Sequence, residues 1–418
     1  MSDFLLWGAT ASPYYLKMQA MLDQDGHAWR RAPEEMSVCR AILLYARLEW
    51  AKARGKVLRF GGMEKGLDEY PAVPFYSLDG RTFYYDSTRL AVHLDDLAGP
   101  RTHSLVPAQP ALRFLARLID EAIDEFGLYM VHHNRWVVSA ATNTMGKITA
   151  KQLRTPALLN PPVARWLARR QSQRCPYLFS VAPDGFDAGV DEAITPPGRA
   201  GFPPTHELLN EAWYRFLSAL EKIFEAQPFA LGERFTIADA SIYGQFSMNL
   251  VDGTANELLL EHAPRTHAWR CNIRDGAHEG SRGELAYSPL LSDLLRLIGD
   301  TFIPLMKQNF AAWQDAVAAG ESRFNEAAFN QGRALDDGEL MGYPFRHVVK
   351  TFQVSVWQDL EKEWNALSPV DRQQLLERLP DKIQDAFSDD EGPAANLPRK
   401  TTALPAASEL KKPLMPNR

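Results

Sequence analysis

A proline set between two short β-type runs constrains the fold of this chain more than any other feature. The runs are residues 73–76 and 82–85, and the Asp79-Gly80 pair between them is a turn signal. Proline cannot donate to a β-ladder, so Pro74 marks a sheet edge or a bend, and a bond to proline is where a cis peptide is affordable. The pattern therefore predicts a hairpin whose first strand begins at a bend.

The same bend predicts a binding surface. A cis bond before Pro74 would leave the N–H and C=O of Val73 facing outward, where an extended peptide could pair with them. Asp86-Ser87 directly follow the second run and supply a carboxylate and helix N-terminal amides. One end of this surface then suits a peptide backbone, and the other suits a ligand carrying both an ammonium group and a carboxylate. The alternatives are an ordinary edge-strand proline and a plain helix cap.

Length, charge and cysteine content limit the classes of protein to consider. At 418 residues and 47.0 kDa the chain exceeds one ordinary core, so we expect two domains with additions. The net charge of −6 gives no electrostatic case for a nucleic-acid partner. Cys39, Cys175 and Cys271 are odd in number and widely spaced, and they form neither a metal motif nor a disulfide framework.

Targeting signals are the next constraint. The N-terminus has no basic segment followed by an apolar run, and no apolar stretch approaches the roughly 18 residues of a membrane span. We therefore expect a cytoplasmic protein without a signal peptide and without a membrane partner.

The first hundred residues predict the element order β-α-β followed by β-β-α. An apolar run at residues 4–8, a helix opening at Ser12-Pro13 and an alternating run at residues 27–32 form the first half. Residues 33–69 are longer than the connection needs and contain a helical pattern. The hairpin and a helix over residues 87–97 complete the unit.

Long amphipathic helices follow residue 110. Helical spacing recurs over residues 112–126, 208–224, 283–319 and 346–378, whereas residues 179–205 are rich in Gly, Pro and Asp and predict a loop or insertion. The predicted architecture is therefore α/β followed by all-α.

The domain boundaries follow from these changes in pattern. We expect an α/β domain over residues 1–100, with 33–69 as an expanded connection, and a helical domain over 105–387 with its insertion at 179–205. Residues 388–418 are polar and Pro-rich, which is typical of a disordered tail.

Four local patterns resemble the cytosolic glutathione transferase family. Ser12-Pro13-Tyr14 resembles the start of the first helix in serine-type members, and Val73-Pro74 resembles the family's cis-proline. Asp86-Ser87 resembles the acidic or amide residue and serine that hold the γ-glutamyl group. Thr236 and Asp239 resemble the buried capping box of the helical domain. The spacing agrees through about residue 270, and the chain looks like a divergent bacterial-type member with an extended C-terminal region.

The resemblance implies a thioredoxin-like domain with a helical substrate domain and extra helices. It implies glutathione as co-substrate, bound by Val73, Pro74, Asp86 and Ser87, with a small hydrophobic electrophile as the second substrate. It further implies a role in detoxification, no metal and a homodimer. The residues that bind the glycine end of glutathione cannot be placed, because residues 33–69 are expanded. The capping pair is interpreted as structural only.

Ser12 is the predicted catalytic residue. A thiol with a pKa near 8.5 is mostly neutral at pH 7, and one charge-assisted hydrogen bond together with a helix N-terminus is enough to populate the thiolate. Ser12 can supply that bond, and Tyr14 or Tyr15 are the alternative donors. The other interpretation of Ser12 is a plain N-cap.

His132-His133 with Arg135-Trp136 would border the substrate pocket in this fold. Adjacent histidines point to different helix faces, so a metal pair is not expected. We expect a surface or interhelical polar role for them.

Three functions remain open on the sequence alone. The first is a glutathione transferase that activates the thiolate for attack on an electrophile. The second is a non-catalytic binding or interaction protein on the same fold, since residues 33–69 and the C-terminal third add surface. The third is a glutathione-dependent lyase, such as an etherase, or a dehalogenase. The sequence leaves the electrophile, the oligomeric state and the role of residues 283–418 undetermined.

Overall fold

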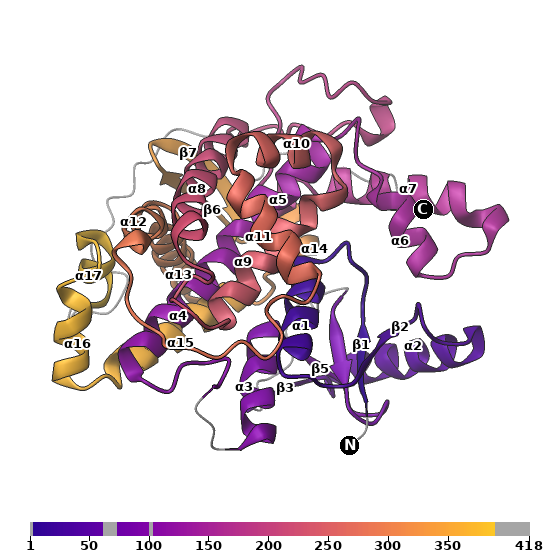
Figure 1. The fold of residues 1–418 in the computed structure, drawn as a ribbon. Coiled ribbons are helices and arrows are strands. Elements are labelled where there is room, and N and C mark those ends of the chain that lie inside the picture. The colour runs from indigo at the N-terminus through magenta and orange to yellow at the C-terminus, as the bar shows by residue number, and fades with distance from the viewer. Residues whose placement is uncertain (1–2, 62–72, 100–102, 389–418) are drawn as a thin grey trace.

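The computed structural model describes residues 3–61, 73–99 and 103–388. A mixed βαβ sheet of thioredoxin-like type comes first and a large helical region follows, which confirms the predicted fold class. Figure 1 shows the sheet with α1, α2 and α3 at the lower right and the helical region above and to the left of it.

The bounds of the elements are as follows. The strands are β1 (Phe4–Trp7), β2 (Trp29–Ala32), β3 (Leu58–Arg59), β4 (Phe75–Ser77), β5 (Tyr84–Tyr85), β6 (Leu335–Leu340) and β7 (Tyr343–Val348). The helices up to the insertion are α1 (Pro13–Gln24), α2 (Val38–Ala53), α3 (Ser87–Ala98), α4 (Pro110–Ala122), η1 (Ile123–Gly127), α5 (Leu128–His133), η2 (Asn134–Val138), α6 (Met145–Gln152), η3 (Ala157–Leu159), α7 (Asn160–Gln173), η4 (Pro176–Leu178) and η5 (Glu192–Ile194). The remaining helices are α8 (His206–Ala226), α9 (Ile237–Ser247), η6 (Met248–Val251), α10 (Gly253–His262), α11 (Pro264–Arg274), η7 (Pro289–Leu291), α12 (Ser292–Asp300), α13 (Phe302–Ala318), α14 (Glu326–Asn330), α15 (Thr351–Asn365), α16 (Pro369–Leu376) and α17 (Asp381–Ser388).

The five-stranded sheet has the order β2-β1-β4-β5-β3. β1 and β2 are parallel and joined through α1, whereas β4 runs antiparallel to both β1 and β5. Trp7 of β1 pairs with Phe75 of β4, so the start of β4 lies beside the end of β1, where the chain turns toward α1. This register brings the segment before α1 and the segment before β4 together at one end of these two neighbouring strands, and we call this the same edge of the sheet.

Successive side chains along the strands point to opposite faces of the sheet, and each face has its own hydrophobic core. Phe4 and Leu6 of β1 and Tyr76 of β4 face α1, α3 and the helical region in one large cluster. Trp7 and Phe75 point to the other face, where Leu44 and Leu48 of α2 cover them. α2 therefore lies on the opposite side of the sheet from the helical region, with its outer side open to solvent.

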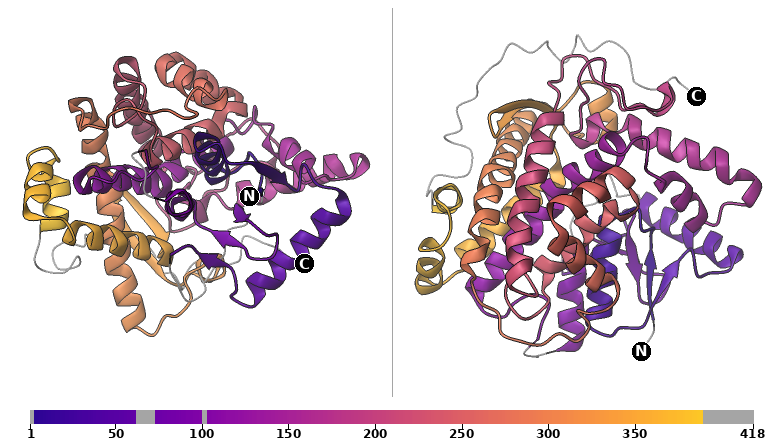
Figure 2. Two further views of the ribbon diagram at one scale, coloured as in Figure 1. Left: turned by 60° about the horizontal axis from the view of Figure 1, so that its bottom comes forward. Right: turned by 45° about the horizontal axis from the view of Figure 1, so that its top comes forward.

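The helical region is built around the continuous helical run α4–η1–α5–η2. Two segments of this run, η1 and η2, are π-helical. Helices α8, α9 and α15 pack around this run, and α1 packs closely against α9. The additional C-terminal elements extend this region; Figure 2 shows α16 and α17 in yellow at its outer side.

Two predictions about elements require correction. The helical pattern assigned to residues 346–378 is wrong at its start, because residues 346–348 belong to the hairpin β6–β7. Met341 and Gly342 both have positive φ angles, 53° and 84°, and form the tight turn that this hairpin needs. The expanded connection also supplies β3, an edge strand parallel to β5 that the sequence pattern did not indicate.

The structure can also be compared with the predictions for the insertion, the C-terminal tail and membrane-spanning segments. Residues 179–205 contain a single short 3₁₀ turn, η5, in otherwise irregular chain. The predicted tail, apart from Ser388 at the end of α17, lies outside the described residues. Within the described part of the chain, no helix is both long and apolar enough to cross a membrane.

Candidate functional site

Ser12 caps the first helix. Its φ and ψ angles of −96° and 125° are extended, and Pro13 follows at the first helical position. Its Oγ accepts from the amide of Tyr15 at 3.4 Å, which is a long bond, and the residue is 7% exposed. No acceptor for its hydroxyl proton is found among the described residues. The Ser12 hydroxyl is therefore both a cap and a donor that is still available at a helix N-terminus.

The loop before Ser12 is held from the helical region. Gln152 of α6 accepts from the amide of Thr10 at 3.1 Å and shares hydrogen bonds with its hydroxyl. Arg135 donates from Nη1 to the carbonyl of Ala11 at 2.8 Å, and its Nε pairs with Asp252 at 2.8 Å. These bonds fix the backbone on which Ser12 stands.

The two tyrosines after Pro13 point into the protein. Tyr15 is buried in the core, and its ring lies so close to Gly8 that a Cβ there would be 2.5 Å from it. Tyr14 donates its hydroxyl to the carbonyl of Asp124 at 2.9 Å. Burial raises the pKa of both phenols. Since a donor to a thiolate must be free to turn toward it, this arrangement favours Ser12 over either tyrosine.

The bend before β4 has the conformation that the sequence indicates. The Val73–Pro74 peptide bond is cis, and a second cis bond joins Ala32 to Pro33. Val73 is half-buried and packs against the cluster beneath α2. Because β4 pairs with β1, this bend lies at the sheet edge that also carries Ser12.

Asp86 begins α3 from a positive φ of 75° and accepts from the amide of Arg89 at 3.1 Å. Its other oxygen pairs with Nε of Arg59 on β3 at 2.5 Å. Burial alone would raise the pKa of Asp86, but the Arg59 guanidinium, the Arg89 amide and Lys17 together outweigh burial and hold that pKa below its usual range. The charge that the sequence assigned to a ligand's ammonium group is thus already paired within the chain.

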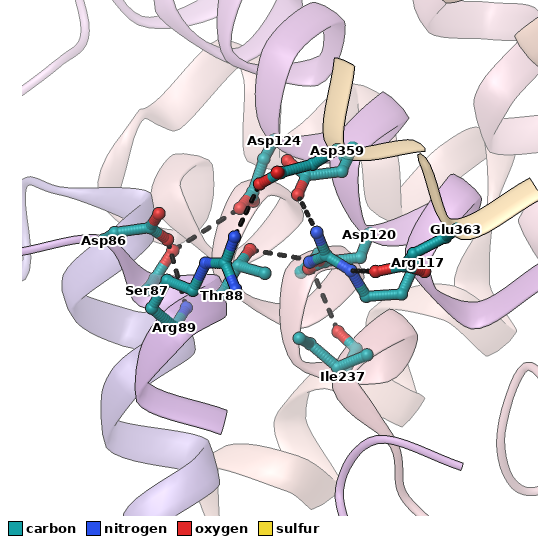
Figure 3. Close-up of polar contacts among 12 residues, drawn as sticks. Asp86, Ser87, Thr88, Arg89, Arg117, Asp120, Asp124, Ile237, Asp359 and Glu363 are labelled. Atoms are coloured by element: carbon teal, nitrogen blue, oxygen red, sulfur yellow. Dashed lines mark hydrogen bonds and ion pairs between the residues drawn. The ribbon is translucent and has the colours of Figure 1, made fainter. Parts of the chain in front are cut away.

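Ser87 also makes an internal contact. Its hydroxyl donates to Asp124 at 3.4 Å, a long bond that Figure 3 shows between α3 and the central helical run. A ligand carboxylate at this helix start would compete with Asp124 for that proton, while the amides of the first turn point outward at the N-terminus.

Helix α15 from the C-terminal third borders this helix start. Asp359 accepts from Arg89 at 2.6 Å and from Arg59 at 3.2 Å, as Figure 3 shows for Arg89. Phe352 packs against the same cluster as Val73, and its ring centroid lies 5.7 Å from the Arg59 guanidinium. Helix α15 therefore forms one wall of the candidate site.

A buried ion cluster lies behind α3. Lys17 of α1 has no exposed side-chain surface and contacts Asp120 at 2.5 Å, Asp124 at 2.7 Å and the hydroxyl of Thr88 at 3.0 Å. Burial lowers the pKa of Lys17, but the two carboxylates outweigh it and raise the pKa above its ordinary value. Asp120 also pairs with Arg117 at 3.0 Å, which in turn contacts Glu363 of α15. The cluster joins α1, α3, α4 and α15.

The histidine pair lies inside the helical region. The Nδ1 of His133 is 2.7 Å from the hydroxyl of Ser180, and the ring of His133 lies 4.9 Å from that of His206. Burial lowers the pKa of His132 to about 3 and that of His133 well below its ordinary value, so both rings are neutral at pH 7. The contacts of His133 join α5 to Ser180 and to His206 of α8, within the helical region.

The capping pair of α9 is present as an interlocked box. Thr236 and Asp239 exchange side-chain and backbone hydrogen bonds, and Asp239 also accepts from the amide of Ala230 at 2.7 Å. Within the described residues, no group of three or more His, Cys, Asp or Glu side chains could hold a metal ion.

The sequence patterns missed most partners of the site residues. Arg59 and Asp359 complete the surroundings of Asp86, yet they lie 27 and 273 positions away from it. Gln152 and Lys17 carry no motif, and a lysine in an amphipathic helix normally faces solvent. One available signal was the density of carboxylates at residues 120–125, in a helix whose other charged residues are Arg113 and Arg117.

Comparison with known proteins gives distant likenesses. No protein-family model and no curated protein sequence matches the chain. Solved structures do match. A glutathione S-transferase of Ceriporiopsis subvermispora in complex with glutathione is 15% identical, with 66% of this chain and 97% of that chain covered at a TM-score of 0.39.

Two further matches are of the same kind. A glutathione S-transferase of Pseudomonas fluorescens is 15% identical over 68% of this chain and 98% of that one, with a TM-score of 0.29. A maleylacetoacetate isomerase of Anaeromyxobacter dehalogenans with bound glutathione is 14% identical over 66% and 96%, with a TM-score of 0.26. At these scores the likeness assigns no role to any residue, and the fold rests on the strand order and helices given above.

Proposed function

We propose that the chain is a glutathione-dependent transferase in which the Ser12 hydroxyl stabilises the glutathione thiolate for attack on a small hydrophobic electrophile. The observation that carries this proposal is the position of Ser12 at the start of α1, with its hydroxyl proton uncommitted among the described residues. The bend at Val73-Pro74 lies at the same sheet edge.

Glutathione would lie along this edge in an extended conformation. Its central backbone would pair with the N–H and C=O of Val73, and its γ-glutamyl carboxylate would bind the amides at the start of α3. Ser87 would turn from Asp124 to donate to that carboxylate. The ammonium group would face Asp86 and Asp359, whose charges Arg59 and Arg89 share in the ligand-free chain.

The reaction needs no general base from the protein. The thiol releases its proton to solvent, and the Ser12 hydroxyl and the N-terminus of α1 stabilise the thiolate that remains. The sulfur then attacks an electrophilic carbon. A carbon–sulfur bond forms, and the leaving group departs with the electron pair of the bond that breaks. One charge-assisted hydrogen bond of about 1.5–3 kcal/mol lowers the thiol pKa by about one to two units.

Replacement of Ser12 by alanine tests the proposal. Turnover of chlorodinitrobenzene with glutathione should fall about 10- to 100-fold, because the thiolate loses its donor. The pH profile of kcat/KM should also move upward by about one to two units. A purely structural cap would change stability without moving that profile.

Ser37→Ala is the matched control, since Ser37 is an exposed serine at the start of α2 whose side chain makes no capping bond. It should turn over like the wild type. If Ser12→Ala retains full turnover with an unchanged melting temperature, the catalytic assignment is wrong.

A non-catalytic binding protein on the same fold is the second candidate. Phe352 favours it, because α15 brings this aromatic ring against the same cluster as Val73, where the backbone of glutathione would pair. Calorimetry decides between the two. An absence of glutathione binding up to millimolar concentration, with recovery of a stable protein partner, would support the second candidate and exclude the first.

A further inference from the structure

Two neighbouring elements at one end of the molecule expose apolar side chains in an unusually basic setting. They are α2 with its flank, residues 38–56, and the pair α6–α7 with its connection, residues 145–174; together we call them the basic end. Figures 1 and 2 show both projecting at the same side of the molecule. They also touch, because Arg154 after α6 donates to the carbonyls of Glu34 and Met36 just before α2.

The outer face of α2 is apolar. Its inner positions Leu44 and Leu48 are buried against the sheet, as in any amphipathic helix. The rest of its surface exposes the large apolar side chains Val38, Ile42, Leu43, Trp50 and, at the flank where it stacks on Trp7, Tyr45. A helix with apolar residues on both faces normally has both faces buried against other parts of the protein or against a partner. The outer face of α2 is the side turned away from the rest of the protein.

Basic residues border this outer face. Arg40, Arg47 and Arg54 recur every seven residues and so lie along one side of the helix. No ion pair joins any of the three to a carboxylate within the described chain. Over residues 38–56 the sequence holds five Lys or Arg and one acidic residue, Glu49, which is paired with Lys52 at 2.9 Å.

The α6–α7 pair repeats this combination. Residues 145–174 hold seven Lys or Arg and no Asp or Glu, in a chain whose net charge is −6. The turn η3 between the helices exposes Leu158 to 93%, and Trp166 on α7 is 61% exposed. Three of these basic side chains form ion pairs with carboxylates. Arg170 and Arg174 pair with Glu326, and Arg165 pairs with Asp191. Lys147, Lys151 and Arg169 are exposed and have no such partner within the described chain.

We propose that the basic end is a docking surface for an anionic phospholipid membrane, with α2 lying in the interface and the η3 turn inserting beside it. Exposed Trp and Leu side chains enter the headgroup region, and flanking Lys and Arg attract anionic lipid. This goes beyond the proposed transferase activity and does not depend on it. It departs from the expectation of no membrane partner, which rested on the absence of an apolar stretch long enough to span a membrane.

Charge and shape favour this occupant over the others. A second copy docking through the same face would bring the two Arg40–Arg47–Arg54 rows together, and like charges oppose that contact. Nucleic acid would engage the cations but leave the aliphatic side chains Ile42 and Leu158 in water. A fluid interface accepts separate protruding apolar side chains without a matching pocket, whereas an acidic protein would need one for each.

Flotation of the full chain with vesicles tests the proposal. The chain should bind vesicles of phosphatidylcholine with phosphatidylserine, should bind phosphatidylcholine alone much more weakly, and should be released by added salt. Arg40→Gln with Lys151→Gln should lower the partition coefficient about 25-fold, because each basic side chain near the surface contributes about fivefold. Arg323→Gln, an exposed arginine between α13 and α14, is the charge control.

The apolar contribution is tested separately. Leu158→Ser with Trp166→Ser should lower binding about tenfold or more while leaving the melting temperature unchanged, because both side chains are exposed. Val370→Ser is the control, since Val370 is 67% exposed on α16 at the opposite end of the molecule.

Three outcomes would overturn the proposal. One is an absence of binding to the anionic vesicles. The second is concentration-dependent dimerisation lost in the Leu158→Ser, Trp166→Ser variant, which would assign the surface to a second copy. The third is capture of an acidic protein or an oligonucleotide by a chain that ignores vesicles.

Discussion

Single buried carboxyl groups set how this molecule responds to pH. Glu125 follows Asp124 in the π-helical turn η1, and burial, with Asp124 beside it, raises the pKa of Glu125 to about 8. The folded chain therefore keeps a proton on Glu125 at neutral pH, where the unfolded chain has released it. Since the folded state binds more protons, its free energy of unfolding falls as pH rises from about 4.5 to about 8 and then levels.

Replacement of Glu125 by glutamine should remove this contribution. The amide is neutral throughout, so the variant should gain stability relative to wild type as pH rises through the window, by a few kcal/mol at its upper end. Urea unfolding at a series of pH values measures the difference. Glu257→Gln, an exposed acid on α10, should track the wild type. Parallel curves for Glu125→Gln and wild type would show that Glu125 is ionised in the folded state.

At the scale of elements, the placement of α1 depends on one close crossing. Gly244 of α9 faces the first turn of α1, where a Cβ would lie 2.5 Å from the carbonyl of Pro13 and 2.9 Å from the Cβ of Lys17. The contacted atoms are mostly backbone and cannot yield without moving α1. Because Ser12 begins that helix, the crossing determines where its hydroxyl stands.

Gly244→Ala should displace α1 and weaken both stability and activity. Overpacking at such a contact costs about 1–3 kcal/mol in the free energy of unfolding, and turnover should fall because Ser12 moves with the helix. Gly127→Ala is the control, since the nearest atom to its Cβ would be 3.6 Å away, an ordinary contact. Thermal melts and turnover measured together check this. An unaffected Gly244→Ala variant would mean that the two helices separate freely.

At the scale of the whole molecule, one hydrophobic cluster runs from the first strand to the last helix. It contains Phe4 and Leu6 of β1, Leu115 of α4, Trp357 of α15 and Phe387 of α17. The C-terminal third is therefore part of the core of this chain and is not an attachment to a molecule complete without it.

A chain ending at residue 282 should consequently fail to fold. Its α4 and α8 would lose the apolar partners that α12, α13 and α15 supply, and the exposed surface should promote aggregation. Size-exclusion chromatography and thermal unfolding measure this against a chain ending at Ser388, which retains every described core residue. A monomeric truncated chain with a cooperative melt would show that the first two thirds form an independent unit.

The features that could be predicted from the sequence are those that depend on residues close together in the chain. Ser12 and the turn at Asp79-Gly80 could be found because a cap and a turn depend on neighbouring residues. The element order and fold class follow from periodicity, which is also local. Arg59, Asp359 and Lys17 could not be found, since each acts through partners that only the tertiary fold brings near.

The buried Lys17 also has a consequence for synthesis. The sheet is made first by the ribosome, but Lys17 lies on its first helix and its counter-charges are Asp120 and Asp124. Burial of a charged ammonium group without them is costly, so we expect the thioredoxin-like part to complete its packing only after residue 124 has been synthesised. On this expectation, the thioredoxin-like part and the helical region fold together, although the former is synthesised earlier.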